Sequence, residues 1–105
     1  MTPEELRNSL TRCRSQVDAI DLELLNLLNR RTRVIEEIGS IKEALDLPIY
    51  EPKREEDVFR HVTGNNTGPL TPDALQRIFE RIIDEMRSLQ RMRRAQQTEG
   101  KTECS

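Results

Sequence analysis

The feature that most restricts how this chain can fold is one apolar seam that runs through its first 45 residues. Leucine, isoleucine, valine and one cysteine recur at alternating spacings of four and three at positions 6, 10, 13, 17, 20, 24 and 27, and again at positions 34, 38, 41 and 45. This spacing predicts a long helix with a heptad seam. At 1.5 Å per residue the helix is about 60 Å long, which exceeds the width of a compact chain of this size. The seam therefore has to pack against a second chain.

The composition supports the same conclusion. Only 34% of the residues are hydrophobic and 3% are aromatic, which is a small supply of core for 105 residues. The net charge of −2 provides no cationic excess for binding a polyanion such as nucleic acid. Fourteen of the seventeen cationic residues are arginine, the residue suited to two-pronged recognition of carboxylates.

Helix boundaries follow from proline and capping residues. Thr2, Pro3 and Glu5 form the pattern of a capping box, and the first helix is expected to run to about Leu45. A second, short helix is expected at about residues 52–63 and a third, of medium length, at about 72–96, each with proline at its first position. The predicted fold class is all-α, with three helices per protomer in an intertwined homodimer bundle.

The predicted domain covers residues 1–96, and residues 97–105 are expected to form a disordered polar tail. The amino terminus has no apolar stretch typical of a signal peptide, and no apolar run has membrane-spanning length. Cys13 and Cys104 lie far apart without metal-binding spacing, which favours free thiols. We therefore expect a cytoplasmic protein with neither membrane nor nucleic acid as a partner.

Several polar residues interrupt the apolar pattern. Arg31 occupies the seam position after Leu27, where an unpaired charge is costly, so it either sets the register of the helices or marks an anion site. Lys42 follows three helical turns later on nearly the same face, about 16 Å away, although taken alone it is typical of a surface lysine. Gln90 lies on the apolar stripe of the third helix and needs a hydrogen-bond partner, unless it sits at the wet edge.

Arg14 precedes Arg31 by seventeen residues, or roughly 25 Å along one helix, so the two cannot contact the same small molecule within one chain. An antiparallel partner helix that crosses near Leu24 and Leu25 would bring its own Arg14 between Arg31 and Lys42. The first helix alone thus suggests composite sites in an interlocked dimer.

Short motifs on all three predicted helices form a further pattern. They are Arg14, Asp18-Ala19-Ile20-Asp21, Leu24-Leu25-Asn26-Leu27-Leu28-Asn29-Arg30-Arg31, Gly39-Ser40-Ile41-Lys42, Pro48-Ile49-Tyr50-Glu51-Pro52-Lys53-Arg54-Glu55, Ile78-Phe79, Ile82-Ile83 and Ser88-Leu89-Gln90. Over about residues 5–92 the chain resembles the all-helical chorismate mutases. The resemblance implies a monofunctional, cofactor-free isomerase that needs no metal and converts chorismate to prephenate on the way to phenylalanine and tyrosine.

The resemblance also implies roles for individual residues. Arg14 of the partner protomer and Arg31 would hold the substrate carboxylates, with Arg54 adding positive charge. Lys42 and Gln90 would donate to the ether oxygen. Glu55 would accept from the ring hydroxyl, near the backbone of Glu51. The pattern departs from the family at Met86, where some members have a small polar residue, and at Glu51, which is often Asp.

Three other interpretations remain open. An isochorismate-pyruvate lyase would share the fold and the cationic pocket. A non-catalytic helical interaction module would explain the seam but not the cations at Arg31 and Lys42. Nucleic-acid binding through Arg87, Arg91, Arg93 and Arg94 is disfavoured by the nineteen acidic residues, and these cations are expected to complement the end of the third helix.

Overall fold

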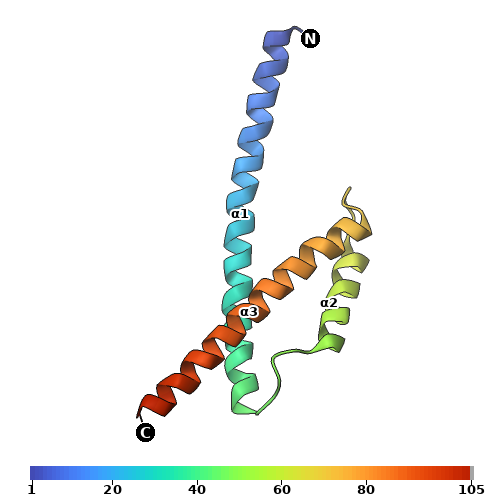
Figure 1. The fold of residues 1–105 in the computed structure, drawn as a ribbon. Coiled ribbons are helices and arrows are strands. Elements are labelled where there is room, and N and C mark those ends of the chain that lie inside the picture. Colours follow the sequence, from blue (N-terminus) through green and yellow to red (C-terminus); the bar gives the residue numbers. More distant parts are fainter. Residues whose placement is uncertain (105) are drawn as a thin grey trace. The chain divides into compact units, whose positions relative to one another are not determined.

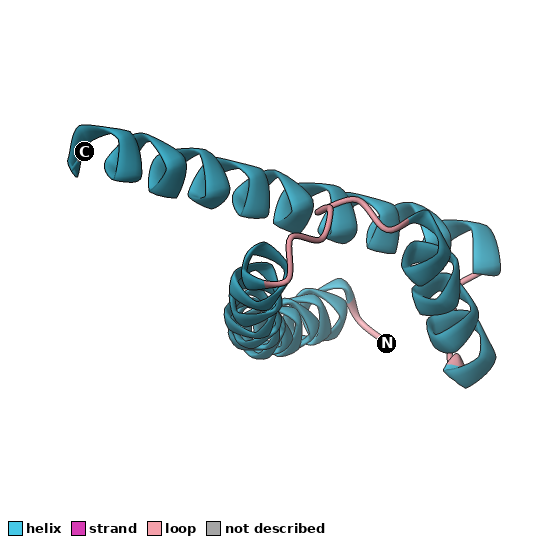
Figure 2. Cartoon of the chain, turned by 90° about the horizontal axis from the view of Figure 1, so that it is seen from below, coloured by secondary structure: helices cyan, strands magenta, loops and turns pink. Residues whose placement is uncertain are grey.

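A computed structural model describes the backbone of residues 1–104 and the side chains of residues 1–96. It contains α1 (Pro3–Ala44), α2 (Pro52–Asn65) and α3 (Pro72–Cys104), which are joined by short loops (Figures 1 and 2). No strand occurs within residues 1–104. The prediction of an all-α fold with three helices is confirmed.

The chain divides into two units, Met1–Val34 and Ile35–Ser105. The first unit consists of the greater part of α1. It begins with the predicted capping box, because Thr2 Oγ1 accepts from the amide of Glu5 at 3.1 Å and Glu5 Oε2 accepts from the amide of Thr2 at 3.2 Å. The leucine, isoleucine and valine residues of the seam from Leu6 to Val34 are 49–58% exposed. A single copy of this unit therefore leaves its seam uncovered.

The second unit contains the last turns of α1 together with α2 and α3. Here α2 packs against α3, and the apolar side chains buried among the described residues are Leu75, Ile83 and Met86. All three lie on α3, at spacings of eight and three residues that place them on one face of the helix. Val58, Phe59 and Val62 of α2 are half-buried.

The end of α1 is a Schellman motif. The amide of Leu47 donates to the carbonyl of Lys42 at 2.7 Å, and the amide of Asp46 donates to the carbonyl of Glu43 at 3.1 Å. Asp46 has a φ of 57°, the left-handed conformation that this motif requires. The motif reverses the chain, so that the connector after it returns past the last turn of α1.

The third helix is longer than the sequence predicted, since it ends at Cys104 and not at about Gln96. No proline follows Pro72, so nothing in the sequence stops the helix there. The expected order or disorder of the tail, residues 97–105, lies outside the residues whose side chains are described. None of the helices in the described part of the chain is both long and apolar enough to cross a bilayer.

Candidate active site

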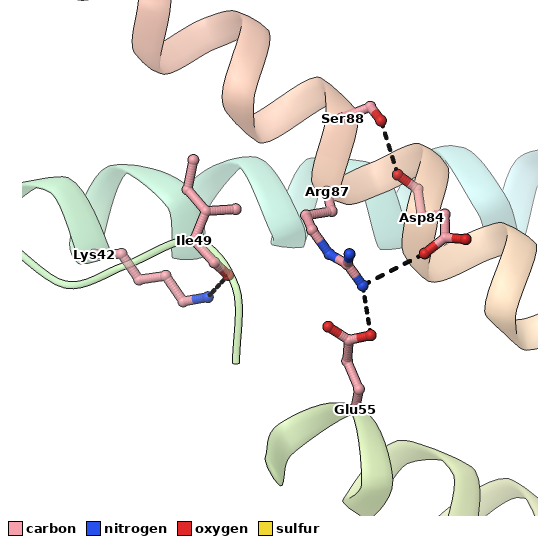
Figure 3. A network of polar contacts seen from close by, with 6 residues as sticks. All are labelled: Lys42, Ile49, Glu55, Asp84, Arg87 and Ser88. Atoms are coloured by element: carbon pink, nitrogen blue, oxygen red, sulfur yellow. Dashed lines mark hydrogen bonds and ion pairs between the residues drawn. The ribbon is translucent and has the colours of Figure 1, made fainter. Parts of the chain in front are cut away.

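Lys42 is a buried cation, with 9% of its surface exposed. Its Nζ donates to the carbonyl of Ile49 at 2.9 Å and forms an ion pair with the carboxylate of Glu51 (Figure 3 shows the Ile49 contact). A buried ammonium is costly unless it is paired, and both partners come from the connector that follows the Schellman motif. An ammonium has three donors, and these contacts account for two of them. Lys42 is therefore held in place by the connector.

A second polar cluster joins α3 to the start of α2. Arg87 NH2 lies 2.5 Å from Glu55 Oε1 and 3.4 Å from Asp84 Oδ1, and Figure 3 shows its side chain reaching from α3 towards Glu55. The guanidinium carbon also lies 4.8 Å from the centre of the Tyr50 ring, within the range of a cation–π interaction. Arg87 and Glu55 are only 19% and 22% exposed along their side chains. Glu55 is thus presented as an oriented carboxylate.

Gln90 connects α3 to the end of α1. Its Nε2 donates to the carbonyl of Ile35 at 3.5 Å, the long limit for such a bond. Its Oε1 is buried and has no hydrogen-bond partner among the residues whose side chains are described. A β-carbon at Gly39 would lie 3.5 Å from Cγ of Gln90, so glycine lets the two helices approach closely here. The amide carries two N–H groups, and the long contact to Ile35 engages one of them.

A groove runs along the contact between α3 and the last turns of α1. It is a shallow, solvent-open groove, lined by Glu36, Gly39, Ser40, Glu43, Ile49, Gln90, Arg93 and Arg94. Gln90 and Ile49 therefore form part of the wall of this groove. The side chain of Lys42 donates a hydrogen bond to the backbone carbonyl of Ile49.

The remaining predicted site residues have different surroundings. Met86 is buried at 6% exposure in the core of the second unit, which explains an apolar residue at this position. Arg54 is exposed on the first turn of α2, and Glu51, the N-terminal flanking residue of α2, pairs with Lys42. Arg31 is half-buried and Arg14 is exposed, both within the first unit. Their convergence with the second unit's residues stays a prediction.

The sequence analysis assigned no role at the site to Arg87 or Tyr50, and its interpretation of Arg87 was wrong. It expected Arg87 to complement the carboxyl end of the third helix, but α3 continues to Cys104 and Arg87 lies well inside it. Its position one turn before Gln90 was a usable signal, because residues three apart share a helix face.

Two further cations of α3 contact other segments of the second unit. Arg93 NH1 lies 2.8 Å from Glu36 Oε2, and Arg94 NH1 donates to the carbonyl of Leu47 at 3.1 Å. Both fasten α3 to the segment around the end of α1. These contacts within the chain give the two arginines a role that needs no nucleic acid.

Comparison with known proteins identifies relatives of the whole helical domain. The family model described as chorismate mutase type II matches residues 13–91. The bifunctional chorismate mutase/prephenate dehydratase of Aquifex aeolicus is 36% identical over 86 residues, which cover 78% of this chain and 24% of the relative. The chain thus spans about a quarter of the length of the bifunctional relatives that it matches.

Solved structures of similar size agree with this. The chorismate mutase of Thermus thermophilus (form II) superposes with a TM-score of 0.77 at 34% identity, over 79% of this chain and 94% of that chain. The chorismate mutase of Helicobacter pylori in complex with prephenate gives a TM-score of 0.75 at 28% identity, over 80% of this chain and 91% of that chain. The predicted family resemblance is confirmed.

Proposed function

The chain belongs to the type II chorismate mutase family, and from this membership we propose that it catalyses the rearrangement of chorismate to prephenate. The proposed partners are chorismate and a second copy of the chain, with neither nucleic acid nor a membrane involved, and the proposed compartment is the cytoplasm. Beside this membership, the observation that supports the proposal is the buried Lys42 ammonium, fixed by Ile49 and Glu51. Such a fixed cation suits an anionic substrate that develops further negative charge as it reacts.

The reaction is a [3,3] rearrangement in which one C–O bond breaks while one C–C bond forms. It needs no covalent bond to the protein and no proton transfer. Two carboxylates on the substrate give cationic side chains a means of holding it in the folded, reactive conformer, which is an orientation effect. We assign this clamp to Arg31, Arg54 and the Arg14 of a partner copy.

Negative charge grows on the ether oxygen as the C–O bond breaks. Donors fixed at this oxygen interact more strongly with the transition state than with the substrate, and such donors accelerate the reaction. We assign the donors to Lys42 and Gln90, and the acceptor for the ring hydroxyl to Glu55. One carboxylate oxygen of Glu55 contacts Arg87, and a carboxylate has the lone pairs to accept from a substrate hydroxyl as well.

The test is turnover by the purified protein. We expect chorismate absorbance to decrease with stoichiometric formation of prephenate, and a bicyclic dicarboxylate that mimics the transition state to inhibit competitively. Isochorismate with pyruvate detection serves as the parallel assay. Faster release of pyruvate from isochorismate than conversion of chorismate would assign the lyase activity to the site. Failure to turn over either substrate or to bind the mimic would favour a non-catalytic helical module.

A further inference from the structure

Arg87 connects the two parts of the second unit that carry proposed site residues. It belongs to α3, three residues before Gln90, and its guanidinium reaches Glu55 on the first turn of α2 at 2.5 Å. Three residues of α-helix rise about 4.5 Å, so the base of Arg87 lies one turn from the base of Gln90. An arginine at this place fixes the separation between an amide donor on α3 and a carboxylate acceptor on α2.

The geometry around Arg87 restricts its side chain from three directions. Asp84 lies one turn earlier on α3, 3.4 Å from NH2. The Tyr50 ring faces the guanidinium carbon at 4.8 Å. The guanidinium and its Glu55 partner are both largely removed from solvent, where a charge-assisted hydrogen bond is stronger than at an exposed surface.

Three consecutive residues of the connector between α1 and α2 contact two different cationic side chains. Ile49 and Glu51 contact Lys42, whereas Tyr50 between them contacts Arg87. The contacts that hold Lys42 thus do not involve Arg87. The ion pair is separated by 32 residues in sequence, which makes it a tertiary contact and not a feature of one helix.

We propose that Arg87 is a positioning residue of the active site, which orients the Glu55 carboxylate towards the substrate's ring hydroxyl without itself contacting the substrate. The proposal rests on the proposed function, since the ring hydroxyl is that of chorismate. It assigns Arg87 a role in recognising one substituent of the substrate, separate from stabilisation of the ether oxygen. Its loss should therefore affect binding of that substituent more than the rearrangement itself.

The experiment compares Arg87→Met with wild type on two substrates: chorismate, and an analogue in which hydrogen replaces the ring hydroxyl. We expect kcat/KM for chorismate to decrease about 10- to 100-fold, mainly through KM, the range for loss of a hydrogen bond to a charged group. On the deoxy analogue the variant should equal wild type within about threefold, because Glu55 then has no hydroxyl to accept from. A merely structural role would lower both activities alike.

Arg81→Met is the matched control. Arg81 also lies on α3 and pairs with a carboxylate, Glu85, at 2.9 Å, but it is 79% exposed along its side chain and its partner lies on its own helix. We expect no more than a twofold change on either substrate. If Arg87→Met does not fold, Arg87→Lys keeps the positive charge without the planar fork, and it should show a smaller loss confined to chorismate.

Two results would overturn the inference: an Arg87 variant that handles chorismate within about threefold of wild type, or one that loses equal activity on both substrates. Failure of the inference and failure of the proposed function are distinguishable, because they are read from different measurements. That function is tested by wild-type turnover of chorismate, and the inference by the ratio of variant to wild type.

Discussion

The two units of this chain differ in how much of their apolar surface they bury. In the first unit, Met1–Val34, the seam of α1 remains half exposed along its length. In the second unit, Ile35–Ser105, Leu75, Ile83 and Met86 are buried, and Lys42 is buried with its charge compensated. The second unit thus builds a small core and a polar site from its own residues. The first unit requires another surface, because a continuous apolar stripe of this length is a mark of association.

The contrast separates two kinds of proposed site residue. Lys42, Glu51, Glu55 and Gln90 are positioned by contacts within the second unit. Arg14 lies on the unit whose seam is uncovered, and the proposed function assigns it to the site of a partner copy. Substitutions in the two units should therefore fail in different ways, one through assembly and the other through chemistry.

Ile20→Asp should have the largest effect, because it places a charge in the seam of the first unit. An uncompensated buried charge costs about 3–5 kcal/mol, and a symmetric dimer contains it twice. We expect loss of the dimer in sedimentation experiments and loss of activity at micromolar concentration. Leu22→Asp, at a residue that is 69% exposed and off the seam, is the control and should remain dimeric. A dimeric, active Ile20→Asp protein would remove the distinction between the units.

Lys42→Ala tests the second unit without disturbing the seam. Loss of one donor to a developing negative charge costs about 3–4 kcal/mol, or roughly a thousandfold in kcat. We expect a folded dimer by circular dichroism and sedimentation, with that loss in steady-state kinetics. Lys53→Ala, an exposed lysine on α2, should behave as wild type. Near-normal kcat in Lys42→Ala would refute the assigned role.

Gln90→Glu should have a smaller effect that depends on pH. The wild-type amide does not titrate, so we expect an activity profile that is flat across neutral pH. A carboxyl group in its place donates a hydrogen bond only while protonated, so activity should be lost as the pH rises and recovered as it falls. We expect about a hundredfold loss at neutral pH. A flat profile for the variant, measured as kcat against pH, would show that Gln90 is not a donor.

Arg93→Ala should have the smallest effect. Arg93 and Glu36 form a pair with side chains 51% and 39% exposed, and exposed pairs contribute about 1 kcal/mol or less. Thermal unfolding should show a small decrease in stability that diminishes further at high salt, with dimerisation unchanged. A change in oligomeric state would mean that the second unit also controls assembly.

Local signals in the sequence were sufficient for most of the fold. The capping box at Thr2 and the prolines at 52 and 72 located the helix starts. The end of α1 was predicted to within one residue, although it is a Schellman motif with Asp46 in place of the usual glycine. The end of α3 was not, because the helix meets no stop signal at Gln96 and continues to Cys104. Helix periodicity describes one face at a time and does not show where a turn brings the chain back.

The site was only partly predictable, again because helix periodicity does not show which segments meet in the folded chain. Lys42 taken alone was interpreted as a typical surface lysine, but the connector folds back and buries it against Ile49 and Glu51. The Arg87–Glu55 pair joins residues on different helices, a tertiary contact that periodicity in one chain does not reveal. Family resemblance supplied Glu55 and Gln90, whereas the partner that orients Glu55 emerged only from the structure.

The claim that two copies share each active site is tested most directly by mixing two inactive variants. Arg14→Ala and Lys42→Ala are unfolded together and refolded, so that half of the dimers contain one chain of each kind. In such a dimer, one site has both an intact Lys42 and an intact partner Arg14, and the other has neither. We predict that the mixture regains about a quarter of wild-type activity, while each variant alone stays inactive. A mixture no more active than the sum of its parents would contradict the shared site.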